Sequence, residues 1–184
     1  MNVLVACEFS GIVREEFGKK GHFAVSCDLL PTEKFGVHYQ DWIENVLDRT
    51  DGKWDLMIAF PSCTYLASSG ARWFRDRRGL QEDAIDFVRF LWNQKIEKIC
   101  IENPVGVLST RFRKPDQYIQ PWQFGHGETK KTCLWLKNLP QLKPTEIVPG
   151  RNPRVHYESP GPDRWKNRSR TLPGIARAMA EQWG

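Results

Sequence analysis

The sequence predicts an α/β fold in which helices cover both faces of a mainly parallel sheet. Short apolar runs rich in branched residues alternate with segments whose apolar residues recur at helical spacing, as in successive βαβ units. Polar residues that could carry chemistry follow several of these runs directly, at positions that parallel strands gather at one sheet edge. The 184 residues suffice for one domain with a sizeable core.

The N-terminal part of the chain supplies two strands and two helices. Val3–Phe9 is a branched apolar run and predicts a buried strand. Ser10 offers an N-cap to an amphipathic helix over residues 11–21. A second strand is predicted for His22–Asp28, and the segment DWIENVL, which begins at Asp41, predicts a short helix.

The central part repeats the alternation. Trp54–Phe60 predicts a strand, and the loop after it contains Cys63. Leu80–Asn93 predicts an exposed helix with one apolar face, formed by Ala84, Ile85, Val88, Leu91 and Trp92. Lys98–Asn103 predicts the next strand, which Pro104 ends.

The C-terminal part is less regular. Thr132–Leu136 predicts a strand, and a basic, proline-rich loop segment follows at about residues 140–170. The chain closes with a predicted helix over residues 173–184, with Pro173 in its first turn. We expect residues 1–184 to form one domain.

Composition narrows the class of protein. Residues 109–184 hold 14 Lys and Arg against 6 Asp and Glu, interleaved with aromatic residues, which suits a polyanion with stackable bases. A solvated basic surface explains the charge equally well. The apolar runs are too short to span a bilayer and MNVLVACEF lacks the basic segment of a secretory signal, so we expect a cytoplasmic protein without membrane partners.

Cys63 is the cysteine that the pattern singles out. The five cysteines form no CxxC pair, so we expect no metal site, and the other four lie in apolar runs. Glu102 follows Cys63 by one strand–helix–strand unit, which predicts that the two lie at the ends of neighbouring strands. A thiolate beside a proton-donating acid is what conjugate addition to an electron-poor ring requires. A solvated strand-end carboxylate is the simpler alternative for Glu102.

Two weaker features point to a nucleoside. Gly11 after the first strand would let the backbone approach a ligand, and Asp28 after the second could hold a ribose. A strand–turn–helix needs a small residue there in any case. Lys130 and Lys131 could lower the pKa of a thiol or hold a phosphate, or could simply be solvated.

The order of the motifs resembles DNA cytosine-5 methyltransferases. CEFSG, CDLL, AFPSC, DRRGL, IEN and RSRTLPGIARAMAE occur in this order through nearly the whole chain. They are similar to that family's DLFAG segment, second-strand acid, PPC or FPC nucleophile loop, DxRG, ENV and closing helix. Ser62 stands where the family has a proline before the nucleophile. The chain resembles the small, single-domain, phage-borne type, which lacks a large target-recognition domain.

The resemblance implies a single Rossmann-like, S-adenosylmethionine-dependent methyltransferase fold. Phe9 would stack on the adenine of the cofactor, Gly11 would admit the cofactor and Asp28 would hold its ribose. Asp41 and Trp42 would flank the adenine. The full set of expected cofactor-binding residues is Phe9, Ser10, Gly11, Asp28, Asp41, Trp42 and Pro61.

The resemblance also implies the reaction. Cys63 would add to C6 of cytosine while Glu102 protonates N3, and C5 would then accept the methyl group. Asn103 would support the loop geometry, and Lys131 is grouped with these catalytic residues. Covalent catalysis of this kind divides one difficult step into easier ones.

DNA is the expected partner, read with low sequence specificity. Residues 140–166 are too few and too proline-rich for a separate reading domain, so we expect phosphate contacts, which position DNA without reading it. The candidates are Lys130, Arg151, Arg154, Arg164, Lys166, Arg168 and Arg170. Two alternatives stay open: modification of free cytosine nucleotides, and a catalytically silent nucleic-acid-binding protein of the same fold.

Overall fold

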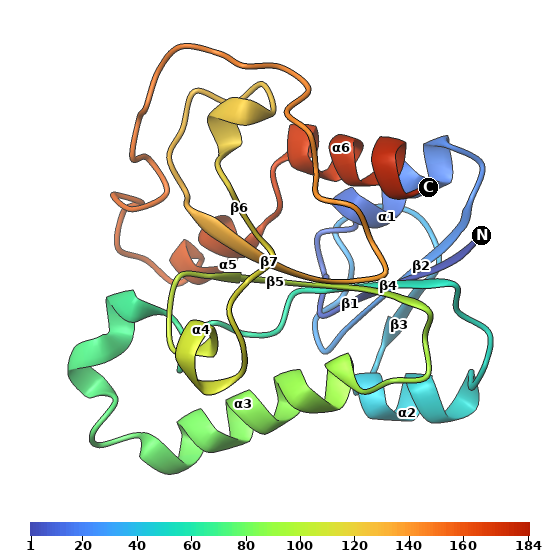
Figure 1. The fold of residues 1–184 in the computed structure, drawn as a ribbon, viewed down its shortest axis with the longest axis horizontal. Coiled ribbons are helices and arrows are strands. Elements are labelled where there is room, and N and C mark those ends of the chain that lie inside the picture. The colour runs from blue at the N-terminus through green and yellow to red at the C-terminus, as the bar shows by residue number, and fades with distance from the viewer.

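A seven-stranded sheet with the strand order β3-β2-β1-β4-β5-β7-β6 forms the centre of the computed structural model (Figure 1). The structure describes the backbone of residues 1–184 and every side chain except that of Trp73. The strands are β1 (Asn2–Ala6), β2 (Phe23–Asp28), β3 (His38–Gln40), β4 (Leu56–Ala59), β5 (Lys98–Pro104), β6 (Gln117–Ile119) and β7 (Thr132–Lys137). The helices are α1 (Ile12–Lys19), α2 (Ile43–Arg49), α3 (Arg78–Trp92), α4 (Leu108–Arg111), α5 (Arg164–Ser169) and α6 (Pro173–Trp183), with 3₁₀ turns η1 (Ser68–Trp73) and η2 (Pro121–Gln123).

The sheet is mixed rather than purely parallel. Strands β3, β2, β1, β4 and β5 pair in parallel, whereas β7 runs antiparallel to both β5 and β6. The connection from β6 to β7 contains only a 3₁₀ turn and loop, and without a crossover helix the next strand returns antiparallel. The predicted α/β class with a mainly parallel sheet is therefore confirmed, and the antiparallel strand is an addition that the sequence did not indicate.

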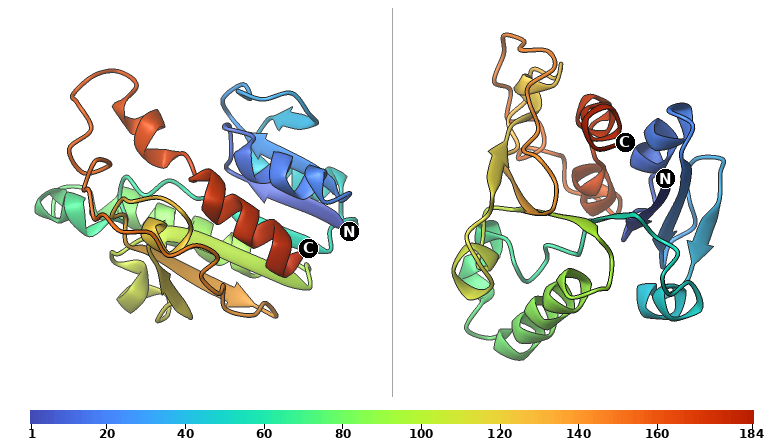
Figure 2. Two further views of the ribbon diagram at one scale, coloured as in Figure 1. Left: turned by 90° about the horizontal axis from the view of Figure 1, so that it is seen from above. Right: turned by 45° about the vertical axis from the view of Figure 1, so that its right-hand side comes forward.

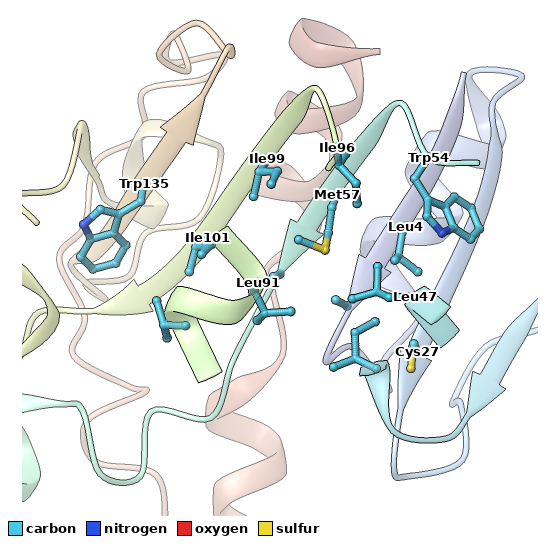
Figure 3. Close-up of a cluster of buried hydrophobic side chains, with 14 of the residues drawn as sticks. Leu4, Cys27, Leu47, Trp54, Met57, Leu91, Ile96, Ile99, Ile101 and Trp135 are labelled. Carbon is cyan, nitrogen blue, oxygen red and sulfur yellow. The ribbon is translucent and has the colours of Figure 1, made fainter. Parts of the chain in front are cut away.

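Helices cover both faces of the sheet, as predicted (Figure 2). Side chains alternate along β1, so that Val3 and Val5 pack with α1 and α6, while Leu4 and Ala6 pack with α2 and α3. Trp135 is the largest fully buried side chain among those described, and it lies in the same cluster as Leu4 (Figure 3). These two apolar layers hold the strand ends in fixed relative positions.

The first strand ends earlier than the prediction of residues 3–9. Cys7 has a φ of 57°, in the left-handed region, so the extended conformation stops at Ala6. Gly11, rather than Ser10, is the N-cap of α1, although Ser10 Oγ still accepts a hydrogen bond from Ile12 N at 3.3 Å. Residues 7–11 thus form an irregular turn after β1.

Several short elements were not predicted. They are β3, α4, β6, the two 3₁₀ turns and α5. Each is six residues or shorter, too short for a period in apolar residues to appear. The segment at 140–170, expected to be a loop, contains α5 at Arg164–Ser169.

Candidate functional site

The candidate site lies at the carboxyl ends of β1, β2, β4 and β5. The strand order reverses between β1 and β4, and ligands bind in the crevice at such a reversal in open α/β sheets. The turn at residues 7–11 follows β1, Asp28 ends β2 and the Cys63 loop follows β4. Glu102 and Asn103 lie in the C-terminal half of β5. The sequence prediction that these features meet at one edge is confirmed by the parallel pairing of the strands.

Neighbouring backbone and side chains hold the Cys63 loop. Buried Asn103 donates from Nδ2 to the carbonyl oxygen of Pro61 at 2.7 Å. The carbonyl oxygen of Cys63 accepts from Leu66 N and Ala67 N at 3.0 and 2.9 Å. These three hydrogen bonds fix the loop even though Ser62 occupies the position where the resembled family has proline.

Gly106 is a site residue that the motif comparison missed. A Cβ at this position would lie 1.9 Å from the carbonyl oxygen of Leu66, and Ala67 forms an isolated bridge with Gly106. Only glycine therefore allows the segment after β5 to lie against the loop that carries Cys63. The signal in the sequence was a lone glycine shortly after ENP, which many turns would also contain.

Cys63 is the only exposed one of the five cysteines, all of which the structure describes. Partial desolvation of the thiol, and then the negative charge of Glu102, raise the pKa of Cys63, while Lys130 and Arg168 act in the opposite direction. Burial raises the pKa of Cys27 further, to about 12. The exposed thiol is thus the accessible one, with two cations placed to favour its thiolate.

The surroundings of Glu102 shift its carboxyl toward the protonated form. Burial raises the pKa of its carboxyl, and only Lys130 and a hydrogen bond with Thr132 oppose this. The side chain is partly buried and lines a small, open recess together with Lys130, Thr132, Leu172 and other residues. A protonated acid in a recess can donate to a ring nitrogen.

The two lysines of the Lys130-Lys131 pair point to different places. Lys130 lines the recess, and its ammonium donates to the carbonyl oxygen of Arg168 at 3.0 Å. The ammonium of Lys131 lies 4.4 Å from the ring centre of Tyr118 on β6. Lys130, which the sequence predicts as a DNA contact, is therefore the lysine that lines the recess beside Glu102, and its charge lowers the pKa of Cys63.

The turn after β1 is more crowded than expected. Phe9 is buried, and its ring lies near the ring of Trp165, 6.2 Å between centres, and 5.7 Å from the guanidinium of Arg170. Ser10 Oγ donates to Glu8 Oε1 at 3.1 Å, and Glu8 Oε2 is buried without a hydrogen-bond partner in the described part of the chain. Burial raises the pKa of Glu8. Glu8 belongs to the group of polar residues that follows the first apolar run in the sequence, where no separate role was predicted for it.

Asp28 and Asp41 are connected through the backbone, since Asp41 N donates to Asp28 O at 3.2 Å. Asp28 accepts from Leu30 N at 3.0 Å, and burial raises its pKa. Asp41 is more fully occupied: it accepts from Trp42 N at 2.7 Å and pairs with Arg49 at 2.5 Å. Asp28 is consequently the better placed of the two to accept hydrogen bonds from a ligand.

The predicted phosphate-binding residues differ in whether a carboxylate of the protein already balances their charge. Arg154 donates to both oxygens of Glu128, at 2.9 and 3.1 Å, and Arg170 donates to both oxygens of Glu33, at 2.8 and 2.5 Å. Their charge is therefore balanced within the protein. Lys166 forms a longer ion pair with Asp163, at 3.8 Å. Arg151 lies 4.0 Å from the ring centre of Trp122, and Arg164 donates to His156 O. The charge of Arg168 lowers the pKa of Cys63.

The residues that the structure describes hold neither a metal-ligand cluster nor a membrane-spanning helix. No group of three or more His, Cys, Asp or Glu side chains is placed to hold a metal ion. None of the helices in this part of the chain combines the length and apolar character needed to cross a membrane.

No protein-family model matches the chain, and a search of curated proteins finds no match. Among solved structures, it is similar to a crystal structure from E. coli described as a "putative DNA modification methyltransferase encoded within prophage". The TM-score is 0.53 and the identity 14 %, over 87 % of this chain and 55 % of the other, so the chain spans just over half of that structure. At this identity the similarity concerns the fold.

Proposed function

We propose that this protein is a DNA methyltransferase that transfers a methyl group from S-adenosylmethionine to C5 of cytosine. The observation that carries the proposal is the placement of an exposed thiol, Cys63, and a carboxyl whose pKa is raised by burial, Glu102, at the ends of neighbouring parallel strands beside the cation of Lys130. The shared fold with a protein described as a DNA modification methyltransferase, and the ordered motifs, support the reaction class.

The residues after β1 and β2 fit the proposed cofactor. Asp28 has one carboxylate oxygen bonded to Leu30 N, and a carboxylate has further acceptor sites for ribose hydroxyls. Phe9 would contact the adenine, and Trp42, which is 61 % exposed, would flank it. When bound, S-adenosylmethionine supplies an electrophilic methyl group. The remaining steps belong to side chains of this chain and to the base.

Cys63 adds to C6 of the cytosine through its thiolate, while Glu102 donates its proton to N3. The addition makes C5 a nucleophilic enamine carbon, which accepts the methyl group. Loss of the proton from C5 to solvent then expels the Cys63 thiolate, N3 returns its proton to the Glu102 carboxylate, and the aromatic ring is restored. Lys130 favours the thiolate before the addition. A cytosine stacked in a duplex must first leave the stack to reach the recess.

Low sequence specificity is part of the proposal. Residues 140–166 contribute loops and the start of α5 but no additional strand, and Arg154 is engaged by Glu128. Base-edge reading needs several side chains in register, each good bidentate pair contributing about 1–3 kcal/mol. We therefore expect a context of one to three bases at most, and DNA affinity that falls steeply as salt rises.

Labelled methyl transfer tests the proposal. The protein is incubated with S-adenosylmethionine carrying a labelled methyl group and with DNA, with free cytosine nucleotides, or with neither. Label in DNA at C5 of cytosine supports the proposal, label only in nucleotides supports the nucleotide alternative, and absence of transfer supports a silent binding protein. DNA that contains 5-fluorocytosine, which cannot lose a proton from C5, should trap a covalent complex. Mapping the methylated cytosines on DNA of mixed sequence then measures specificity.

A further inference from the structure

Arg14, on α1, is a buried charged side chain that the proposed chemistry does not use. It is 3 % exposed, and buried cations are normally paired with carboxylates. The guanidinium of Arg14 instead donates to the segment that follows β2 and to β2 itself. Its acceptors are Lys34 O (2.7 Å), Phe35 O (3.2 Å), Val37 O (3.2 Å), Thr32 Oγ1 (3.3 Å) and Ser26 Oγ (2.6 Å).

Two glycines make room for this guanidinium. Gly11 has a φ of 70°, and a Cβ there would lie 2.7 Å from Nη2 of Arg14. Gly36 has a φ of 139°, and a Cβ there would lie 2.9 Å from Nε of Arg14. Gly11 was expected to admit the cofactor, but the atom nearest to the position of its missing Cβ is Nη2 of Arg14. Both glycines are therefore explained by one side chain.

The segment that Arg14 holds connects the residues proposed to bind the cofactor. Residues 29–37 leave β2 at Asp28 and return as β3, after which Asp41 N donates to Asp28 O at 3.2 Å. Midway, Glu33 N donates to the carbonyl oxygen of Phe9 at 2.9 Å. This segment thus links the backbone of Phe9, through Glu33, to the chain that leaves Asp28, in addition to the direct pairing of β1 with β2.

We propose that Arg14 is a positioning residue for the cofactor, because its guanidinium holds residues 32–37 and so places Asp28 relative to Phe9. This inference rests on the proposed use of S-adenosylmethionine. A planar guanidinium presents five N–H donors in a fixed fork, whereas an ammonium is a compact point charge. Lysine at position 14 would keep the charge but could not bind several carbonyls and Ser26 at once.

The test measures cofactor affinity and turnover separately. Arg14→Lys should weaken binding of S-adenosylmethionine, followed by calorimetry, by about tenfold or more, a change of about 1.4 kcal/mol. Turnover at saturating cofactor should stay within about twofold of wild type, since the residue touches no reacting atom. Gly36→Ala should act in the same direction, because its Cβ would displace the guanidinium without removing it.

Two matched controls should leave affinity unchanged. Lys34→Ala removes a different link between this segment and α1, the ion pair of the Lys34 ammonium with Glu15, but keeps the carbonyl oxygen that Arg14 uses. Gly21→Ala introduces a Cβ at another glycine of positive φ, 82°, where no atom lies within 4 Å. The controls separate loss of the Arg14 contacts from general effects of substitution in this region.

Each outcome decides the role of Arg14. Wild-type affinity in folded Arg14→Lys and Gly36→Ala overturns the inference, and so does a parallel loss of turnover at saturating cofactor. If a melting curve shows that Arg14→Lys does not fold, the cofactor affinity of Gly36→Ala decides whether Arg14 positions the cofactor. Failure of both to fold makes Arg14 part of the scaffold and overturns the inference. A wild-type protein that binds no cofactor overturns the proposed function itself.

Discussion

The two halves of the candidate site are built differently. On the side of β4 and β5, hydrogen bonds to backbone carbonyl oxygens hold the Cys63 loop, and an open recess lies beside Glu102. On the side of β1 and β2, charged and aromatic side chains of the chain itself crowd the strand ends, with Arg14 beneath the following segment and Arg170 over Phe9.

The difference separates two tasks. A nucleophile and an acid must be held at fixed positions relative to one base, which short backbone contacts achieve. A cofactor needs a shaped surface, and here side chains from distant parts of the sequence shape it. Substitutions on the first side should therefore change turnover, and substitutions on the second should change cofactor affinity.

The largest expected contrast is between two cysteines, one from each side. Cys63→Ala should lower methyl transfer by at least about 10⁴-fold, as expected for a covalent nucleophile, and should leave the melting temperature unchanged because the thiol is exposed. Cys27→Ala removes a buried thiol from β2 and should destabilise the fold by about 1 kcal/mol or more while keeping the chemistry. Methyl transfer and thermal unfolding measure the two effects. Undiminished transfer by Cys63→Ala would falsify the mechanism.

Two acids give the next contrast. Glu102→Gln should lower turnover by about 10²–10⁴-fold, since the amide cannot act as a general acid, whereas Glu8→Gln, with its oxygen still able to accept from Val13 N, should retain turnover. The comparison uses initial rates at saturating DNA and cofactor. Equal losses in both variants would show that burial of an acid, rather than proton donation, is what the protein needs.

Glu102 also predicts a pH dependence of stability. Its folded-state pKa is raised by burial, so between the unfolded and folded pKa values the folded protein binds more protons and its unfolding free energy falls as pH rises. Glu102→Gln stays neutral, so its urea-unfolding free energy should equal that of wild type in acid and exceed it at neutral pH. A variant less stable than wild type at neutral pH contradicts this sign.

Two glycines test the division between turnover and affinity. Gly106→Ala would push the Leu66 carbonyl oxygen and so displace the Cys63 loop; misplacement by about 1 Å costs about 10²-fold in rate. Gly11→Ala disturbs Arg14 and should instead raise the KM for S-adenosylmethionine. Steady-state kinetics over both substrates separates kcat from KM. If both variants change the same parameter, the two sides are not independent.

The smallest effect concerns the neighbouring lysines. Lys130→Ala should lower turnover by about tenfold and raise the pKa values of Cys63 and Glu102 that appear in the pH–rate profile, because its charge lowers both. Lys131→Ala, whose ammonium lies over Tyr118, should change turnover less than about twofold. A larger loss of turnover in Lys131→Ala than in Lys130→Ala would assign the catalytic role to Lys131.

The sequence by itself predicted the features that depend on local regularity. The spacing at which apolar residues recur predicted the main strands and helices, because a buried strand or helix face imposes its period on consecutive residues. The unit between Cys63 and Glu102 placed both at one sheet edge, because parallel strands joined by a helix end on the same side.

Only the tertiary structure decided the features that depend on close approach between distant residues. The antiparallel direction of β7 follows from the short connection between β6 and β7. The packing around Glu102 places Lys130, and not Lys131, in the recess. Glycine is needed at position 106 because a Cβ there would collide with the carbonyl oxygen of Leu66. No spacing between residues in the sequence indicated the role of Arg14, because its acceptors lie up to 23 positions away, most of them in a loop without regular structure. Such contacts leave no period in the sequence, because they depend on how the whole chain packs.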